Sequence, residues 1–182
     1  MQLRYLNITT AVATGAGLFG IWRASAFVEV VGLDSWEEQV AEDTALRQHI
    51  DDGSFVPINI GGDGSFQMAV RGVETPGQLD ERESQYLLVS SKPYLIISDG
   101  FLELGGLEAV GSYSGAEKVE VELDEGRYCV VIHLLDWKAE PGSVDADGNP
   151  TSSALSDFVI EVFKEPLDGL EYRLEVETFE RS

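Results

Sequence analysis

The feature that most constrains the fold is an almost wholly apolar run, residues 127–135, which follows a stretch of regular alternation. Over residues 119–123, valine and leucine alternate with glutamate, which is the period of a strand with one face in a core and one in solvent. The tripeptide Asp124-Glu125-Gly126 between the two predicts a turn. A run that is apolar at successive positions is typical of a central strand covered on both faces. The sequence therefore predicts a hairpin whose second strand is buried within a sheet.

Further short apolar segments, separated by glycine, proline and aspartate, predict more strands. They cover residues 5–13, 18–31, 55–60, 66–71, 86–90, 94–98, 101–104, 158–162 and 172–176. The glycine-rich residues 61–64 predict a hairpin between two of these strands, and Asp99-Gly100 predicts another tight turn. The polar residues 74–85 and 139–156 are typical of loops.

One helix is expected near residues 35–50. Ser35 and Glu38 have the spacing of a capping box, and Trp36 and Val40 begin an apolar stripe with helical spacing. Together the patterns predict a mainly β (α+β) fold, either an antiparallel β-sandwich or a partly open barrel with this helix packed against it. The chain of 182 residues has no linker-like stretch, so we expect a single β-rich domain over residues 1–182.

The first 26 residues permit two interpretations. Ala24-Ser25-Ala26 has the small-x-small form of a signal-peptidase site, which would place cleavage after Ala26 and export the protein. Arg23 beside that site, and the glycines and threonines before it, instead favour two strands that belong to the fold. No run of about 18 apolar residues is present, so we expect no membrane span. The single cysteine and two histidines fit a cytoplasmic protein.

The net charge of the chain narrows the classes of macromolecule that it could bind. Asp and Glu number 33 against 12 Lys and Arg, a formal net charge of −21, and residues 99–182 hold 20 of the acids against 6 basic residues. A surface of this sign does not neutralise phosphates, so we expect neither nucleic acid nor an anionic membrane as partner. It does attract basic proteins. Nuclease toxins present basic clefts, so an acidic inhibitor or immunity protein is a physically sound hypothesis.

Few residues offer metal or catalytic chemistry. Cys129 is the only cysteine, and it lies four residues from His133, about 13 Å along a strand, too far for a thiolate–imidazole pair. For these two residues we expect a buried thiol and a hydrogen-bonded histidine. Residues 145–149 resemble the start of a calcium loop, but Pro150 and Ser156 stand where that loop needs glycine and glutamate. We therefore expect no cofactor, no metal and no catalytic residue. A hydrolase that uses cleft carboxylates stays open as an alternative.

The candidate contact residues lie where the long apolar strand ends. Asp136 and Trp137 follow it directly, and the acidic loop continues through Glu140, Asp145 and Asp147. An aromatic residue beside carboxylates is a plausible contact hot spot, although Trp137 would equally well cap the core. A small-ligand or carbohydrate-binding module is a further alternative, because tryptophans at positions 22, 36 and 137 could stack on a sugar.

A family resemblance rests on turns and strand ends. The segments concerned are Ile8–Ala13, Asp34-Ser35-Trp36, Gly61–Phe66, Asp124–Tyr128 and His133–Trp137. In them the chain resembles small bacterial proteins with a domain of unknown function, and its layout is distantly similar to β-rich competence-type nuclease inhibitors and toxin-immunity proteins. That resemblance implies a non-catalytic protein that binds a basic protein partner, and it transfers no catalytic residue.

Overall fold

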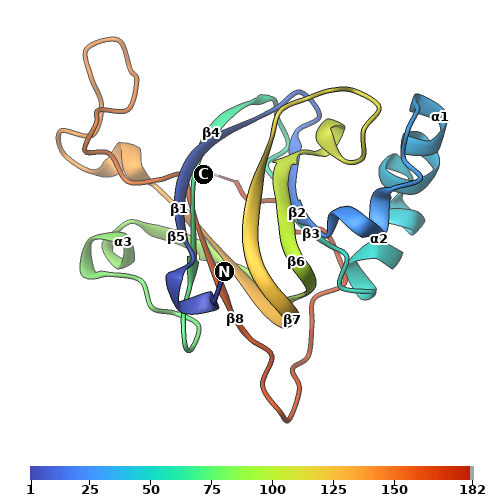
Figure 1. The fold of residues 1–182 in the computed structure, drawn as a ribbon. Helices are drawn as coiled ribbons and strands as arrows, with labels where there is room; N and C mark the ends of the chain where they lie inside the picture. The colour runs from blue at the N-terminus through green and yellow to red at the C-terminus, as the bar shows by residue number, and fades with distance from the viewer. Residues whose placement is uncertain (181–182) are drawn as a thin grey trace.

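The computed structural model describes residues 1–180 and consists of a curled, mixed β-sheet with helices at its margins (Figure 1). Its strands are β1 (Asn7–Thr14), β2 (Leu18–Trp22), β3 (Phe55–Asn59), β4 (Gly64–Gly72), β5 (Leu87–Ser90), β6 (Tyr94–Gly106), β7 (Lys118–Leu135) and β8 (Phe158–Lys164). Seven are ordered β1-β4-β8-β7-β6-β2-β3, and β5 pairs with β7. Every pair is antiparallel except β4 with β8. The prediction of a mainly β fold is confirmed.

The central strand is β7, and its second half is buried on both faces as the apolar run predicted. Tyr128 and Ile132 pack into the main core, whereas Cys129 and Val131 on the opposite face join a smaller cluster that includes Phe163. Residues 128–135 are all buried. Along its edges this half of β7 pairs with β6 and β8, and on its second face Val73 and Tyr172 pack against the smaller cluster.

Two predicted tight turns are wrong, because the chain continues through both as strand. At Asp99-Gly100 and at Asp124-Glu125-Gly126, β6 and β7 stay paired, with Ser98 opposite Gly126 and Gly100 opposite Leu123. Two residues of β7 therefore oppose one residue of β6, which is a β-bulge. Gly100 (φ 125°) and Gly126 (φ 155°) supply backbone angles that serve a bulge as well as a turn. The bulge bends both long strands and so curls the sheet.

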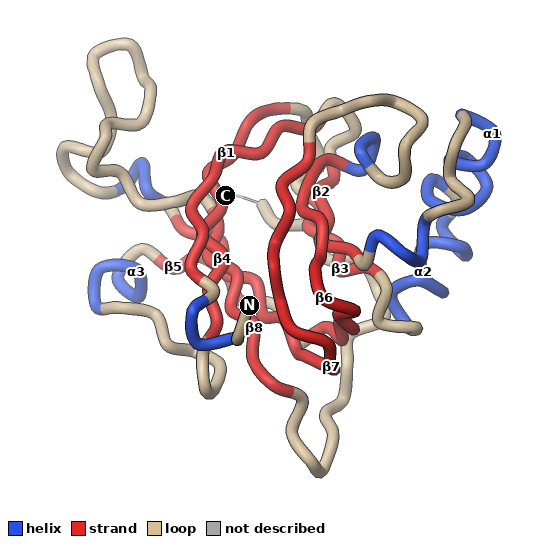
Figure 2. Tube along the Cα trace, viewed as in Figure 1, coloured by secondary structure: helices blue, strands red, loops and turns tan. Residues whose placement is uncertain are grey.

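The predicted hairpin across residues 61–64 is also wrong. β3 pairs with β2 and β4 pairs with β1, so the two strands lie at opposite ends of the sheet order. The connections β1–β2 and β3–β4 both cross between these ends, and they touch where Ile60 N donates to Gly17 O over 3.1 Å. This crossing draws the two ends of the sheet together without pairing them. Figure 2 shows the resulting open, barrel-like curl.

The helix expected over residues 35–50 is present but broken. It comprises α1 (Leu33–Trp36), a π-helical turn η3 (Glu37–Ala41) and α2 (Asp43–Asp51). Glu42 is extended (φ −77°, ψ 125°), and its carboxylate caps α2 by accepting from Ala45 N. These helices lie beside β2 and β3 (Figure 1). Shorter elements are η1 (Leu3–Tyr5), η2 (Ala24–Phe27), α3 (Glu81–Gln85), η4 (Leu107–Ala109) and η5 (Trp137–Ala139), of which α3 lies in the predicted loop 74–85.

The residues predicted as a last strand, 172–176, are not a strand. They run beside the sheet with isolated contacts, such as the Tyr94 hydroxyl donating to Glu175 O over 2.7 Å. At the other end of the chain, the first 26 residues supply β1 and β2, and Phe19 and Trp22 are fully buried. Cleavage after Ala26 would remove both strands from this sheet. No helix within residues 1–180 has the length and apolar character needed to cross a membrane.

Candidate functional site

The curled sheet is open between β1 and the first half of β7. In the described chain, β1 pairs with β4 alone, and residues 118–127 of β7 pair with β6 alone. Each strand therefore keeps one edge without a strand partner. We call the opening between residues 9–13 and residues 116–122 the seam.

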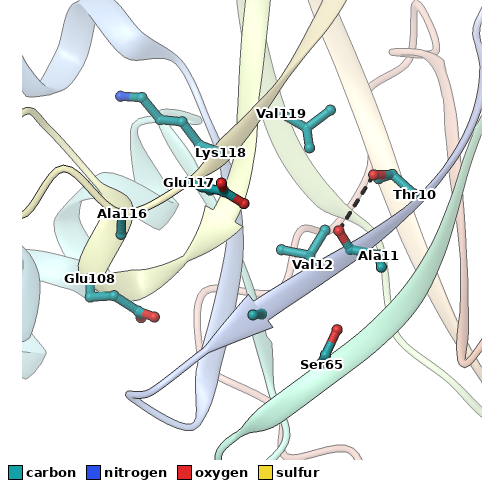
Figure 3. Close-up of a pocket in the computed structure, with 10 residues that line it drawn as sticks. Thr10, Ala11, Val12, Ser65, Glu108, Ala116, Glu117, Lys118 and Val119 are labelled. Atoms are coloured by element: carbon teal, nitrogen blue, oxygen red, sulfur yellow. Dashed lines mark hydrogen bonds between the residues drawn. The ribbon is translucent and has the colours of Figure 1, made fainter.

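A cavity of about 760 Å³ fills the seam. Figure 3 shows its two walls, with Val12 from β1 and Val119 from β7 on either side of the opening. The lining residues are Thr10, Ala11, Val12, Ala13, Ser65, Glu108, Ala116, Glu117, Lys118 and Val119. Because consecutive residues line both walls, the main chain of each edge faces the cavity, and not only its side chains.

The ladder between β1 and β4 fixes which peptide groups of β1 face the seam. Gly72 N donates to Leu6 O over 2.9 Å, and the same register pairs Ile8 with Val70 and Val12 with Phe66. In an antiparallel pair, hydrogen-bonded positions alternate with positions whose N–H and C=O point away. Even-numbered residues of β1 therefore bond β4. Thr9, Ala11 and Ala13, whose side chains are exposed, direct their peptide groups into the seam.

Both ends of the seam are held by hydrogen bonds. At one end the Met1 ammonium lies 3.0 Å from Asp124 Oδ1, and Asp124 N donates to Met1 O over 2.9 Å. At the other end Glu108 accepts from the Thr14 hydroxyl over 3.0 Å and from Gly15 N over 2.8 Å. The two walls are thus tied together above and below the cavity but not along it.

Acidic side chains line the β7 wall of the seam. Glu117, Glu120 and Glu122 are exposed, whereas the one cation of this wall, Lys118, is 2.9 Å from Glu103 and is neutralised by it. The opposite wall carries no charge between Asn7 and Thr14. Across residues 1–180, ion pairs involve seven of the 33 acidic side chains, so most of the negative charge is left to the solvent.

The five contact residues expected from the sequence lie beyond β7 in different environments. Trp137 is 5% exposed and donates from Nε1 to Asp157 over 2.8 Å, and Asp136 is half-buried. Glu140 is held by Arg82, which keeps the pKa of that carboxyl below its usual range. Asp145 and Asp147 are exposed. The predicted loop 139–156 is confirmed, because it contains no strand of the sheet and only the end of η5.

The loop reaches the same strand that forms the seam. Thr9 of β1 and Gln67 of β4 line a second cavity, of about 390 Å³, together with Trp137 and residues 150–157. Gln67 N donates to Asp157 over 2.7 Å, which fastens the loop to β4. The strand β1 thus separates the seam from the acidic loop, and both features adjoin one edge of the sheet.

The calcium-like loop and the tryptophans that the sequence offered as ligand sites are engaged in local contacts of the fold. Within residues 1–180 no three His, Cys, Asp or Glu side chains group in a way that could hold a metal ion. Asp145 Oδ1 accepts from Asp147 N and Asn149 N, which is a local Asx turn. Of the tryptophans offered as stacking platforms, Trp22 and Trp137 are buried, and Trp36 is half-buried against Tyr113.

A hydrogen-bond chain that the sequence did not predict crosses three strands. Ser90 Oγ lies 2.7 Å from His133 Nδ1, and His133 Nε2 lies 3.2 Å from Glu161 Oε2. Glu161 is fully buried and also accepts from Gly77 N over 2.6 Å. Burial alone would raise the pKa of Glu161, but the hydrogen bonds from His133 and Gly77 outweigh it and lower that pKa. The chain thus consists of a hydroxyl, an imidazole and a carboxylate, each within hydrogen-bond distance of the next.

The chain of contacts continues toward α3. Arg71 lies opposite Glu161 in the β4–β8 pair, 3.8 Å from Glu161 Oε1, and makes two hydrogen bonds to Glu83 of α3. The residues therefore form a polar ladder over β5, β7, β8 and β4, beneath loop 74–85. The sequence held one signal of it, since Glu161 is the one charge among the apolar residues 158–163. Only strand pairing reveals its partners.

The lone cysteine also has polar neighbours. Cys129 Sγ lies 3.7 Å from the Tyr172 hydroxyl, which donates to Glu165 over 2.5 Å. Burial raises the pKa of Cys129. Hydrogen bonds from Arg127 and Tyr172 lower the pKa of Glu165 to about 2. The expectation of a buried thiol and a hydrogen-bonded histidine, rather than a Cys129–His133 pair, is confirmed.

No protein-family model and no curated protein matches this sequence. Two solved structures are similar to it. A structure described as crocagin biosynthetic gene J has a TM-score of 0.56 and 13% identity, covering 88% of this chain and 97% of that one. ComJ from Bacillus subtilis, described as an inhibitor of the DNA-degrading activity of NucA, has a TM-score of 0.48 and 7% identity, covering 86% and 95%. The first similarity shows a shared fold. The second is by its description a nuclease inhibitor, the class of protein that the turns and strand ends of this sequence resemble.

Proposed function

We propose that this chain is a non-catalytic binding protein whose partner is a basic protein. One observation carries the proposal, namely that the negative charge is left unneutralised. The formal net charge is −21, and internal ion pairs use only a minority of the acidic side chains in residues 1–180. Keeping so many like charges on one surface opposes folding through self-repulsion, whereas it accelerates and strengthens binding to a cationic partner.

More specifically, we propose that the basic partner is a nuclease toxin. Such enzymes hold phosphate in basic clefts, and an acidic protein that enters the cleft would act as an inhibitor or immunity protein. The proposed loop contacts are Asp136, Trp137, Glu140, Asp145 and Asp147. Asp145 and Asp147 are exposed, so they are the members best placed to meet a partner.

Capture followed by a salt series tests the proposal. The immobilised chain is exposed to lysate of its native host at 50 mM and at 500 mM salt, and proteins released by salt are identified, purified and titrated calorimetrically. We expect a basic protein whose affinity falls at least tenfold between the two salts, because screening shortens the electrostatic range. Capture only of acidic proteins, or affinity independent of salt, would contradict the proposal.

The hydrogen-bond chain Ser90–His133–Glu161 favours a second candidate, a serine hydrolase. In that case Ser90 Oγ would pass its proton to His133 Nδ1 and bond to the acyl carbon of an ester or amide, while Glu161 stabilised the imidazolium. The imidazolium would then return the proton to the leaving alcohol or amine as its bond to the acyl carbon breaks. A fluorophosphonate probe decides between the two. Labelling of Ser90 that vanishes in His133→Gln supports the hydrolase, and absence of labelling leaves the network a structural one.

A further inference from the structure

We infer that the seam is a strand-addition site, which takes up an extended basic segment of the protein partner as an extra strand between β1 and β7. The inference rests on the proposed function for the nature of the partner. Its own support is geometric, because two unpaired strand edges face one cavity of about 760 Å³.

The β1 edge lacks the features that normally protect an edge strand. Proteins block such edges with lysine, proline, bulges or inward-pointing charges, since a free edge pairs with other chains. Between Asn7 and Thr14 the strand has none of these: it contains threonine, alanine, valine and isoleucine, and its pairing with β4 is regular over all eight residues. An unprotected edge that opens into a cavity has the properties of a docking edge.

The main chain supplies the affinity of such a site. Thr9, Ala11 and Ala13 direct their N–H and C=O groups into the seam, and the edge of β7 runs along its other wall. A segment of about four to six residues, at roughly 3.3 Å per residue, would span this length. Val12 and Val119 at the seam offer apolar contacts to alternate side chains of the segment.

The negative charge of the β7 wall determines which kind of segment could bind in the seam. Glu117, Glu120 and Glu122 are exposed on the β7 wall, and the nearby Lys118 is engaged by Glu103. A segment with lysine or arginine at alternate positions would therefore face carboxylates on one side of the new strand, whereas an acidic segment would be repelled. The occupant is thus a basic, extended stretch of a protein.

A peptide titration tests the inference directly. The probe is an acetylated and amidated seven-residue peptide in which lysine alternates with valine, and binding to the full chain is measured by calorimetry. The main variant is Ala11→Pro, which removes an N–H that faces the seam without breaking the β4 ladder. We expect it to weaken binding at least tenfold. Glu120→Lys with Glu122→Lys should do the same, whereas the matched reversal Glu37→Lys with Glu38→Lys on the helical segment should change affinity less than twofold.

A modified peptide tests the inference on the unaltered chain, so that the result does not depend on whether a variant folds. The same peptide N-methylated at alternate residues retains its charge but cannot complete both ladders, so it should bind at least tenfold more weakly to the unaltered chain. Two results would overturn strand addition at the seam: a methylated peptide that binds as tightly as the unmethylated one, or the same loss of affinity from both double charge reversals. Either result would leave the proposal of an acidic binding surface standing. Binding of a glutamate–valine peptide as tight as the lysine one would contradict both. A dimer of the free chain that Ala11→Pro dissociates would show a second copy in the seam and overturn the basic segment as occupant.

Discussion

Replacement of Glu161 by alanine tests the polar ladder beneath loop 74–85. Glu161 is fully buried and accepts from His133 Nε2 over 3.2 Å and from Gly77 N over 2.6 Å. Its removal leaves the buried His133 donor without its acceptor, at about 1–3 kcal/mol, whereas Gly77 is an exposed residue whose N–H can bond water instead. Arg71 keeps both hydrogen bonds to Glu83, so it adds little. We expect Glu161→Ala to lower the free energy of unfolding by about 2–4 kcal/mol, from the unmet His133 donor and from the space that the side chain leaves.

Urea denaturation at pH 7 measures the effect, with Glu171→Ala as the control at an exposed carboxylate. Glu171 is exposed, so its loss should change the free energy of unfolding by about 0.5 kcal/mol or less. The pKa of Glu161 is lowered by folding, so its contribution is complete above the ordinary carboxylate pKa and disappears as pH falls through the folded value. The gap between the unaltered chain and Glu161→Ala should therefore narrow in acid. A loss no larger than that of Glu171→Ala would refute the reasoning.

Three further outcomes follow from the same structure. In Gly20→Ala the new Cβ would lie 2.2 Å from the Phe55 ring, so thermal unfolding should reveal a loss of about 1–3 kcal/mol, and an unchanged Tm would show that this contact gives way freely. The carboxyl of Glu165 should titrate near pH 2 by NMR, and should return toward its ordinary value in Arg127→Gln; stability from this group is present above about pH 4.3 and is lost as pH falls toward 2. Trp137→Phe removes a buried indole hydrogen bond, so urea denaturation should show a loss of about 1–3 kcal/mol, and no loss would mean that the indole is not held as described.

Local patterning predicted most strands but not their neighbours. The apolar run 127–135 identified a doubly covered strand correctly, because burial on both faces leaves a direct mark on composition. Asp99-Gly100 and Gly126 were assigned to turns, yet they form a bulge. Glycine with positive φ serves both structures, and only the pairing of the flanking segments distinguishes them.

The candidate site was less predictable for the same reason. Ser90, His133 and Glu161 are 43 and 28 residues apart, and they meet because β5 and β8 both pair with β7. The seam depends on a neighbour that β1 does not have, and a missing partner leaves no pattern in a sequence. What the composition did indicate was the sign of the charge around it.

Residue-resolved amide exchange of β1 tests the open seam most directly. In the free chain, the amides of Thr10 and Val12 bond β4 and should exchange slowly, whereas those of Thr9, Ala11 and Ala13 should exchange rapidly. Addition of the lysine–valine peptide should protect the second group and leave the first unchanged. Uniform slow exchange along β1 before any peptide is added would show that its outer edge is already paired, and would contradict the account.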